Sequence, residues 1–485
     1  MVTAASVGIL LTRRFGPVKS MTNPPSIHSA ARSEASTLAP LFRVPITAYL
    51  ILFTYSIVLF CLLDYQSLWL DEILQILSTR SGKLEYTEQL TRIGVGAGPL
   101  GWLPQLVAIH LFGYSTAVAR LPSALAAVAS CLTIFFTARE LGLRYPLVPA
   151  ILLGVLPLHF RYALEGRPYA QGVLFSALAT LVFIQLIKRQ SIPFCIIYAF
   201  ILVLGIYTQP FTCFTACGHF LWTLTVWRQR RLVYLSAGAL AFMVLTFLPW
   251  YFYASPLARQ MIQFTGVHFQ LSWKTPLMLI REITGAGYWG SAILLPLAAV
   301  GFYRGCTSAA MKWLLLICSV VPVVCVLLAD AVFGYFLAIR QIIFILPPLV
   351  LLAADGVSAL MHAAHRRVVA ATAVLTIVFV GSDIGWLRKP REDWKLGART
   401  VEQLRTEYSA CTLYAPPGSL VYYNFFEPRL ADTVCGAHSV AEGSVIVAIS
   451  PYATEGDRVS IQELLKDKHE DGSRVVGKST IQVFR

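Results

Sequence analysis

The chain has 485 residues, of which 56% are hydrophobic and only 13% are charged, and its mean hydropathy is +0.65. Soluble domains carry about 25% charged residues, so this composition excludes a water-soluble enzyme, and it equally excludes a disordered or fibrous chain. The net charge of +14 has two interpretations. It indicates either nucleic-acid binding or membrane orientation, because Lys and Arg collect on the cytoplasmic side of membrane proteins.

Residues 1–43 are rich in Ser, Ala and Pro and contain five basic residues. The apolar run before Arg13 is too short to span a bilayer, and it precedes the arginines, which is the reverse of a signal peptide. We expect a flexible cytoplasmic tail, with Met21 as an alternative start.

A transmembrane helix needs about 20 largely apolar residues, and the first such stretch is 44–63. After a polar stretch, 98–113 is short, edged by aromatic residues and interrupted by prolines. We expect it to lie in the membrane interface, within a first external loop over 64–120 that holds interfacial helices. About eleven spans are then expected, at 44–63, 121–138, 146–160, 170–187, 192–208, 211–227, 232–250, 288–303, 313–329, 341–360 and 368–386.

This arrangement places the N-terminus in the cytoplasm and the C-terminal region outside. Before residue 387, the cytoplasmic side then holds 16 basic and 3 acidic residues, and the outer side 10 and 9. The excess of positive charge is therefore an orientation signal, and no nucleic-acid partner is expected.

Residues 387–485 differ in character, with 13 basic and 13 acidic residues. A helix is predicted over 393–408, and β-like runs occupy 419–424 and 444–450. We expect a small extracytoplasmic α/β domain, which follows a transmembrane domain over 44–386. Cys411 and Cys435 lie in this domain, where an oxidising compartment would allow a disulfide between them.

Acids close to lipid are candidates for function because charge is costly there. Asp71 and Glu72 are adjacent and follow the first span directly. At the membrane boundary, one of these carboxylates could take a proton from an incoming hydroxyl or amine. The alternative is a solvated loop that Trp69 anchors in the interface.

A second cluster, Arg161 to Tyr169, holds two arginines, one acid and two tyrosines within nine residues. The planar fork of arginine suits phosphate recognition. The alternative is a belt of arginines whose charged ends reach the interface.

Other sites of known chemistry are not indicated. The chain has no P-loop, no GxGxxG run and no repeat of 20–50 residues, so an ATP-driven pump is not expected. It has no Cys/His cluster, so no metal or other cofactor is expected, although the Asp71-Glu72 pair could hold a divalent ion weakly.

The two clusters resemble motifs of the GT-C glycosyltransferases. Leu68-Trp69-Leu70-Asp71-Glu72 resembles the acidic motif in the first external loop of the branch that contains protein O-mannosyltransferases and the lipid A aminoarabinose transferase. Glu165, Arg167, Tyr169 and Ala170 occupy the E, R, Y and A positions of that branch's YSxEARxYAL stretch. Further matches follow in the family's order over about residues 50–400. With the family's own motif in parentheses, they are Arg120–Leu125 (RLPSAL), Leu204–Thr208 (LGLYT), Phe247–Trp250 (FLPW), Arg340–Pro348 (RYLLFLLPP) and Asp393–Lys395 (DWR).

The chain departs from the family at three positions. The family's HPPLYY segment is here Ala97–Trp102 and lacks its His, and Gln209 and Gln341 replace a family His and Tyr. No role of those family residues is therefore carried over to this chain.

The resemblance implies a polytopic α-helical membrane protein that moves a sugar from a polyprenyl-phosphate donor to a lipid, glycan or protein acceptor on the outer side of a bacterial inner membrane. By this resemblance Asp71 is the general base, and Glu72 orients the acceptor or raises the pKa of the base. Arg167 and Arg340 bind the departing phosphate, and Glu165 and Tyr169 contact the donor or orient Arg167. Weaker phosphate candidates are Arg120 and Arg161, with Arg259, Lys274 and Arg281 of an expected 251–287 loop.

Two other classes of protein compete with this interpretation. A transporter or flippase for a lipid-linked glycan would also need many spans, and it predicts charged residues near the bilayer midplane, where Asp355 is a candidate. A structural membrane protein with an external binding domain would give no reason for the two charged clusters. Convergence of Asp71, Glu165, Arg167 and Arg340 on one site would favour the enzyme.

Overall fold

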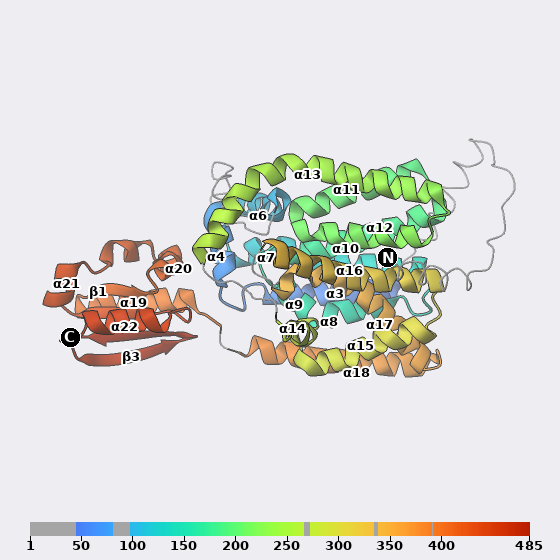
Figure 1. Cartoon of the computed structure of the whole chain (residues 1–485). Coiled ribbons are helices and arrows are strands. Elements are labelled where there is room, and N and C mark those ends of the chain that lie inside the picture. The colour runs from blue at the N-terminus through green and yellow to red at the C-terminus, as the bar shows by residue number, and fades with distance from the viewer. Residues whose placement is uncertain (1–44, 81–97, 266–271, 334–337, 390) are drawn as a thin grey trace. The chain divides into compact units, whose positions relative to one another are not determined.

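The computed structural model describes residues 45–80, 98–265, 272–333, 338–389 and 391–485, and Figure 1 traces them. The chain divides into two units, Met1–Ile46 and Thr47–Arg485. Apart from Ile46 at the start of the first described helix, every element below belongs to the second unit. The predicted tail, 1–43, lies outside the described residues.

In the first half of the chain, every element of secondary structure that the structure describes is a helix. The predicted interfacial segment at 98–113 is a helix, whereas the span predicted at 146–160 is two short helices that meet at Leu156-Pro157. The helices are α3 (Ile46–Leu62), α4 (Leu70–Thr79), α6 (Pro99–Phe112), α7 (Thr116–Glu140), α8 (Leu147–Val155), α9 (Pro157–Ala163), α10 (Tyr169–Arg189), α11 (Ile192–Thr208), η2 (Pro210–Thr212) and α12 (Cys213–Thr225).

The helices continue up to residue 387. The expected 251–287 loop is largely wrong, because the apolar and aromatic run after Trp250 prolongs one helix to Thr265 and a second helix begins at Thr275. The elements are α13 (Arg230–Thr265), α14 (Thr275–Glu282), α15 (Gly287–Arg304), α16 (Ala309–Phe333), η3 (Ile339–Gln341), η4 (Ile343–Ile345), α17 (Leu346–Leu360) and α18 (His365–Leu387).

Within the described residues, six helical segments are long and apolar enough to cross a membrane, and a seventh span results if the bent pair α14 and α15 is counted as one. Three further apolar helices, α3, α6 and α11, are shorter. The structure therefore confirms a polytopic helical membrane protein but does not confirm eleven spans.

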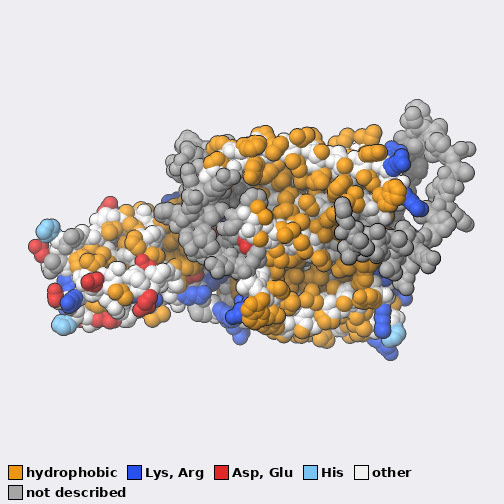
Figure 2. All heavy atoms as spheres, viewed as in Figure 1, with side chains coloured by type: hydrophobic (Ala, Val, Ile, Leu, Met, Phe, Trp, Pro, Cys, Tyr) orange, Lys and Arg blue, Asp and Glu red, His pale blue; other side chains and the backbone are white. Residues whose placement is uncertain are grey.

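The surface of these helices is apolar, because a helix satisfies its own backbone polar groups and can face lipid with hydrophobic side chains. Tyr234, Phe252 and Ile377 are each more than two-thirds exposed. Hydrophobic side chains cover most of the visible face of the helical region (Figure 2). Such a surface is stable in lipid and unstable in water.

Inside the bundle, small residues allow close helix packing. Gly301 of α15 and Gly356 of α17 face each other, and a Cβ atom on either glycine would overlap a backbone carbonyl of the other helix. The α10 helix is central and packs against both α7 and α11. Two buried hydroxyl groups, those of Ser176 on α10 and Thr215 on α12, lie 3.1 Å apart and form a hydrogen bond with each other.

The region after residue 390 contains a four-stranded sheet of order β1-β2-β4-β3, in which only β1 and β2 are parallel. The small α/β domain predicted from sequence is therefore present, although the boundary at residue 387 stays a prediction. Its elements are α19 (Trp394–Tyr408), β1 (Cys411–Ala415), η5 (Pro417–Ser419), α20 (Leu420–Phe426), η6 (Pro428–Thr433), α21 (Ala437–Glu442), β2 (Val445–Ile449), α22 (Glu455–Leu464), β3 (Glu470–Val476) and β4 (Ser479–Phe484).

The predicted strand at 419–424 is wrong, because these residues form most of helix α20. Their aromatic side chains have high β-propensity, but propensity is weaker than tertiary packing. Tyr423 is fully buried, with its ring 5.3 Å from that of Trp394 on α19 and 5.4 Å from that of Tyr414 on β1. The helix places this ring in the domain core.

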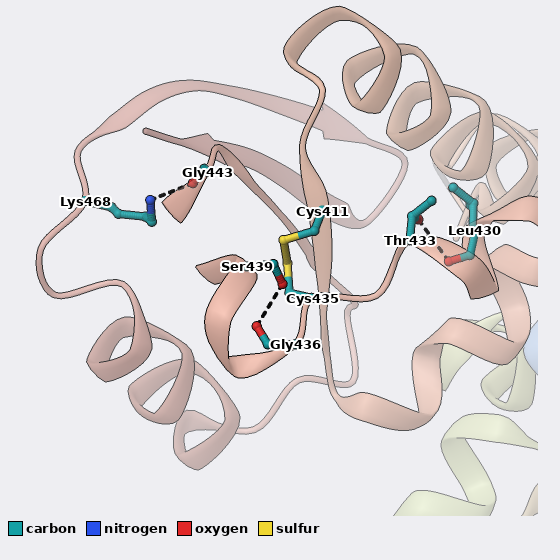
Figure 3. The surroundings of a disulfide bond; sticks show 8 residues. All are labelled: Cys411, Leu430, Thr433, Cys435, Gly436, Ser439, Gly443 and Lys468. Atoms are coloured by element: carbon teal, nitrogen blue, oxygen red, sulfur yellow. Dashed lines mark hydrogen bonds between the residues drawn. A yellow bond between two sulfur atoms is a disulfide. The ribbon is translucent and has the colours of Figure 1, made fainter. Parts of the chain in front are cut away.

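A disulfide joins Cys411 of β1 to Cys435, with the two Cα atoms 4.9 Å apart (Figure 3). The bond ties the connection before α21 to the sheet. A backbone hydrogen bond from Cys435 N–H to the Thr412 carbonyl, 3.0 Å, reinforces the same junction.

Candidate active site

The acidic pair begins helix α4, where its two members face different surroundings. Successive residues of a helix point about 100° apart, so adjacent side chains do not share a face. The Glu72 side chain is fully buried, whereas that of Asp71 is 20% exposed.

Glu72 forms a bidentate ion pair with Arg120 of α7, with both N–O distances 2.7 Å. The Glu72 oxygens also accept hydrogen bonds from the backbone N–H groups of Trp69, 2.9 Å, and Gly166, 2.7 Å. Burial alone would raise the pKa of Glu72, but the charge and hydrogen bonds of Arg120 hold this pKa below its ordinary value. Both oxygens of Glu72 are thus engaged within the protein.

Arg120 is itself almost fully buried and has a complete set of acceptors. Besides Glu72, it donates to the carbonyls of Leu63, 2.8 Å, Gln66, 2.9 Å, and Ser67, 3.2 Å. The pair therefore holds together α7, the start of α4 and the connection that follows α3.

Asp71 pairs with Arg340, which lies in η3 just before α17, at 3.2 Å between Oδ2 and Nη2. The two side chains are 20% and 23% exposed, so both groups are accessible. Two residues that are 269 positions apart in the chain thus meet at one accessible point.

The second cluster forms the connection between α9 and α10, beside this ion pair. Arg340 and Arg167 both lie over the ring of Tyr169, each 5.9 Å from its centroid. Arg167 is buried and donates to the Gln75 side chain on α4 at 3.2 Å, while its Nε has no partner among the described residues. Two guanidinium groups and an aromatic ring therefore converge near Asp71.

Glu165 lies in the same connection and is almost fully buried. Burial and the nearby charge of Glu72 raise the pKa of Glu165 to about 7, against the opposing charges of Arg391 and Arg340. At neutral pH this carboxyl group is therefore protonated in a large fraction of molecules.

A network of amide side chains holds this connection in place. Gln75 and Gln105 each donate to the Gly166 carbonyl, at 3.0 and 3.1 Å, and Gln105 also donates to the Ala119 carbonyl at 2.9 Å. Sequence reasoning missed both residues. A signal was present for Gln75, because it lies four residues after Asp71 and so shares its face of the helix.

Two of the remaining predicted arginines, Arg161 and Arg281, do not join this group. Arg161 lies over the ring of Trp386, 5.3 Å away, and Arg281 is half exposed and pairs with its neighbour Glu282. Arg259 lies in α13, but its side chain is outside the described part of the structure. Asp355, the transporter candidate, accepts hydrogen bonds from the backbone N–H groups of Cys306, 3.0 Å, and Thr307, 3.1 Å, as a loop cap does.

The region after α18 adds residues that the sequence analysis did not identify. Arg391 lies over the rings of Trp386, 4.7 Å, and Trp69, 5.8 Å, and its charge acts on Glu165. Burial and the charge of Asp71 raise the pKa of Tyr422 to about 12. The position of Arg391 two residues before the Asp393-Trp394-Lys395 motif was the available signal.

Within the described ranges, no group of three His, Cys, Asp or Glu side chains is placed to hold a metal ion. The site as described works with carboxylates, guanidinium groups and aromatic rings.

Comparison with known proteins bears on the family and the fold of the chain. Residues 99–250 match the sequence profile of the family described as dolichyl-phosphate-mannose-protein mannosyltransferase. No curated protein sequence matches the chain significantly.

Two solved structures are similar over most of the chain. ArnT from Cupriavidus metallidurans in the apo state has a TM-score of 0.56 and 13% identity, and covers 90% of this chain and 97% of its own. ArnT from the same organism bound to undecaprenyl phosphate has a TM-score of 0.56 and 12% identity, and covers 91% and 98%. The family match covers less than half of the chain, and the two solved structures show that the chain has their overall fold.

Proposed function

We propose that the chain transfers a sugar from a polyprenyl-phosphate donor to an acceptor on the outer side of a bacterial inner membrane. The proposal places the N-terminus in the cytoplasm and the C-terminal domain outside. The donor class is supported by the similarity to ArnT, whose structure with undecaprenyl phosphate shares this fold. The acceptor is a lipid, a glycan or a protein.

The observation that carries the proposal is the accessible Asp71–Arg340 ion pair. An incoming donor phosphate would compete with Asp71 for Arg340, because phosphate oxygens match the guanidinium fork. Asp71 would then lose its positively charged partner and become free to take the acceptor's proton. Donor binding and base activation are coupled in this scheme.

The other residues divide into contact and positioning roles. Arg167, whose Nε has no partner among the described residues, would share the phosphate with Arg340 as charge grows on the leaving group. Tyr169 lies against both arginines and would fix their planes. Glu165, when protonated, would donate a hydrogen bond to the donor. Glu72 positions Asp71 and the Gly166 backbone and does not contact substrate.

The experiment is a transfer assay in detergent or nanodiscs with a polyprenyl-phosphate-linked sugar and a cell-envelope extract as acceptor. Asp71→Asn should lower turnover by at least 100-fold and should lower the KM for donor, because the base is lost while the phosphate site remains and no longer faces a competing carboxylate. Arg340→Ala should raise the donor KM at least tenfold and change the acceptor KM much less.

Matched controls lie outside the site. Asp471→Asn removes one partner of an exposed ion pair in the C-terminal domain and Arg405→Ala one partner of a partly exposed pair there, and both variants should leave transfer unchanged. Near-normal turnover in a folded Asp71→Asn variant would show that Asp71 is not the base. Equal effects of Arg340→Ala on the donor and the acceptor KM would remove the phosphate role.

A further inference from the structure

A cavity of about 350 Å³ lies beside the proposed active site and is not used by the chemistry described above. Its lining residues come from the start of α4, the end of α18, the connection to α19 and the β3–β4 turn. They are Trp69, Trp386, Lys389, Arg391, Glu392 and Lys478. Trp69 is only two residues before Asp71, so the wall of the cavity and the proposed base belong to one turn of the chain.

The charges around the cavity favour an anion. Three of its six lining residues are cations and one is an acid. The acid, Glu392, is almost fully buried, and its Oε1 accepts a hydrogen bond of 2.6 Å from the Tyr452 hydroxyl. Lys389, Arg391 and Lys478 therefore leave an excess of positive charge that a phosphate or carboxylate would neutralise.

The two tryptophans add a second kind of contact. The rings of Trp69 and Trp386 both lie within 6 Å of the Arg391 guanidinium, at 5.8 and 4.7 Å. Aromatic faces beside fixed cations match a molecule that has both flat apolar faces and negative charge. A sugar ring with an acidic substituent has this combination.

Two buried polar atoms of the lining residues also favour a sugar ligand. Trp69 Nε1 and Glu392 Oε2 are buried and form no hydrogen bond with any described residue. A buried polar atom without a partner destabilises the fold, so such atoms call for a ligand or a bound water. One is a donor and the other an acceptor, which is the pair of partners that sugar hydroxyls require.

The turn that carries Lys478 is held against this wall. Gly477 has φ of +59°, and a Cβ atom added there would overlap the Arg391 carbonyl and lie 2.8 Å from the Asp393 nitrogen. Only glycine allows this close approach of the β3–β4 turn to the chain segment at 391–393. Lys478 and Arg391 are thus fixed on one side of the cavity.

We infer that this cavity binds the acceptor through an acidic sugar residue, one that bears a phosphate or a carboxylate. The identification of the ligand as the acceptor rests on the proposed function, whereas the existence of the binding site does not. The donor phosphate is assigned to Arg167 and Arg340, so the cavity is free to hold the second substrate within reach of Asp71.

The test uses the full chain in detergent and four probes: glucose 1-phosphate, glucuronic acid, glucose and inorganic phosphate. Binding is measured by isothermal titration calorimetry. At least one of the two acidic sugars should bind ten or more times tighter than both glucose and inorganic phosphate, and which one does so identifies the acidic group. Arg391→Ala and Lys478→Ala should each weaken that binding about tenfold, and Trp386→Ala should weaken it without changing the binding of inorganic phosphate.

Lys466→Ala, in the C-terminal domain but outside this cavity, is the matched control and should bind as the wild type does. Equal binding of glucose and the acidic sugars, or no effect of Arg391→Ala in a folded variant, would overturn the inference. Binding of inorganic phosphate as tight as that of the tighter-binding acidic sugar would overturn the saccharide part. Asp71→Asn should bind the acidic sugar at least as tightly as the wild type, so a failure of the transfer mechanism is distinguishable from a failure of this site.

Discussion

Removal of the Arg120 side chain is the strongest test of how the site is held together. Arg120→Ala leaves the Glu72 carboxylate buried and without a counter-ion, and it removes donors from the carbonyls of Leu63, Gln66 and Ser67. The Glu72 side chain is fully buried, so water cannot replace the lost guanidinium without opening the structure. Breaking a buried ion pair on one side costs about 3–5 kcal/mol.

The expected loss can be separated from a general effect of mutation. Surface ion pairs contribute about 0–1 kcal/mol, so Arg405→Ala, in a partly exposed surface pair with Glu402, gives the baseline. Replacement of both partners by apolar residues, as in Glu72→Met with Arg120→Met, removes both buried charges of the pair. The double variant should therefore unfold at a higher denaturant concentration than Arg120→Ala.

The assay is unfolding of the detergent-solubilised chain in increasing denaturant, followed by intrinsic fluorescence and far-UV circular dichroism. The expected order of stability is wild type and Arg405→Ala first, then the double variant, then Arg120→Ala. An Arg120→Ala midpoint equal to that of Arg405→Ala would refute the argument, since it would mean that the buried pair contributes no more than a surface pair.

Three further predictions concern separate parts of the molecule. Burial and the Glu72 charge raise the pKa of Glu165 to about 7, so the folded chain keeps this proton while the unfolded chain releases it near pH 4.5. The denaturant concentration at the unfolding midpoint should therefore decrease as the pH rises from about 5 to 7, and Glu165→Gln should remove that part of the decrease. The Cys411–Cys435 disulfide spans 24 residues, so Cys411→Ser should destabilise the C-terminal domain by about 3 kcal/mol in denaturant unfolding, whereas Cys61→Ser, an exposed free cysteine, should have no effect. Gly477→Ala should displace the β3–β4 turn and weaken binding of acidic sugars by at least tenfold in calorimetry, whereas Gly418→Ala, whose Cβ atom meets open space, should bind them as the wild type does.

The membrane helices were largely predictable because lipid imposes one simple rule on them. A run of about 20 apolar residues forms a helix in a bilayer, whatever its neighbours are. The predicted spans at 170–187 and 368–386 lie within α10 and α18. Prediction failed where tertiary contacts decide, as at the broken segment around Leu156-Pro157 and at α20, whose aromatic residues follow the domain core and not their strand propensity.

The candidate site was predictable in its residue types but not in its pairings. The motifs identified Asp71, Glu72, Arg167 and Arg340, yet the partner of each acid lies far away in the chain. Arg120 was considered as a phosphate ligand, whereas the structure uses it as the counter-ion of Glu72. One local signal for the inward position of Glu72 was available. A Glu at the third position of a helix commonly accepts a hydrogen bond from the backbone of the capping residue, and Glu72 accepts one from the Trp69 N–H.

The three acids near the site, Asp71, Glu72 and Glu165, differ in charge state and in accessibility because their surroundings differ. Glu72 has a buried guanidinium of its own and stays ionised, and its charge raises the pKa of Glu165, which lacks such a partner. Two carboxylates that differ in this way supply one fixed negative charge and one group that can donate a hydrogen bond at neutral pH. Asp71 faces the accessible side, where its partner Arg340 is also the proposed phosphate ligand. A donor phosphate would draw Arg340 away from Asp71 and, as a further negative charge, would favour the protonated form of Glu165. In the proposed mechanism, the same binding event would free the base and keep the proton on the donor-contacting acid, so the donor would have to bind before the acceptor is deprotonated.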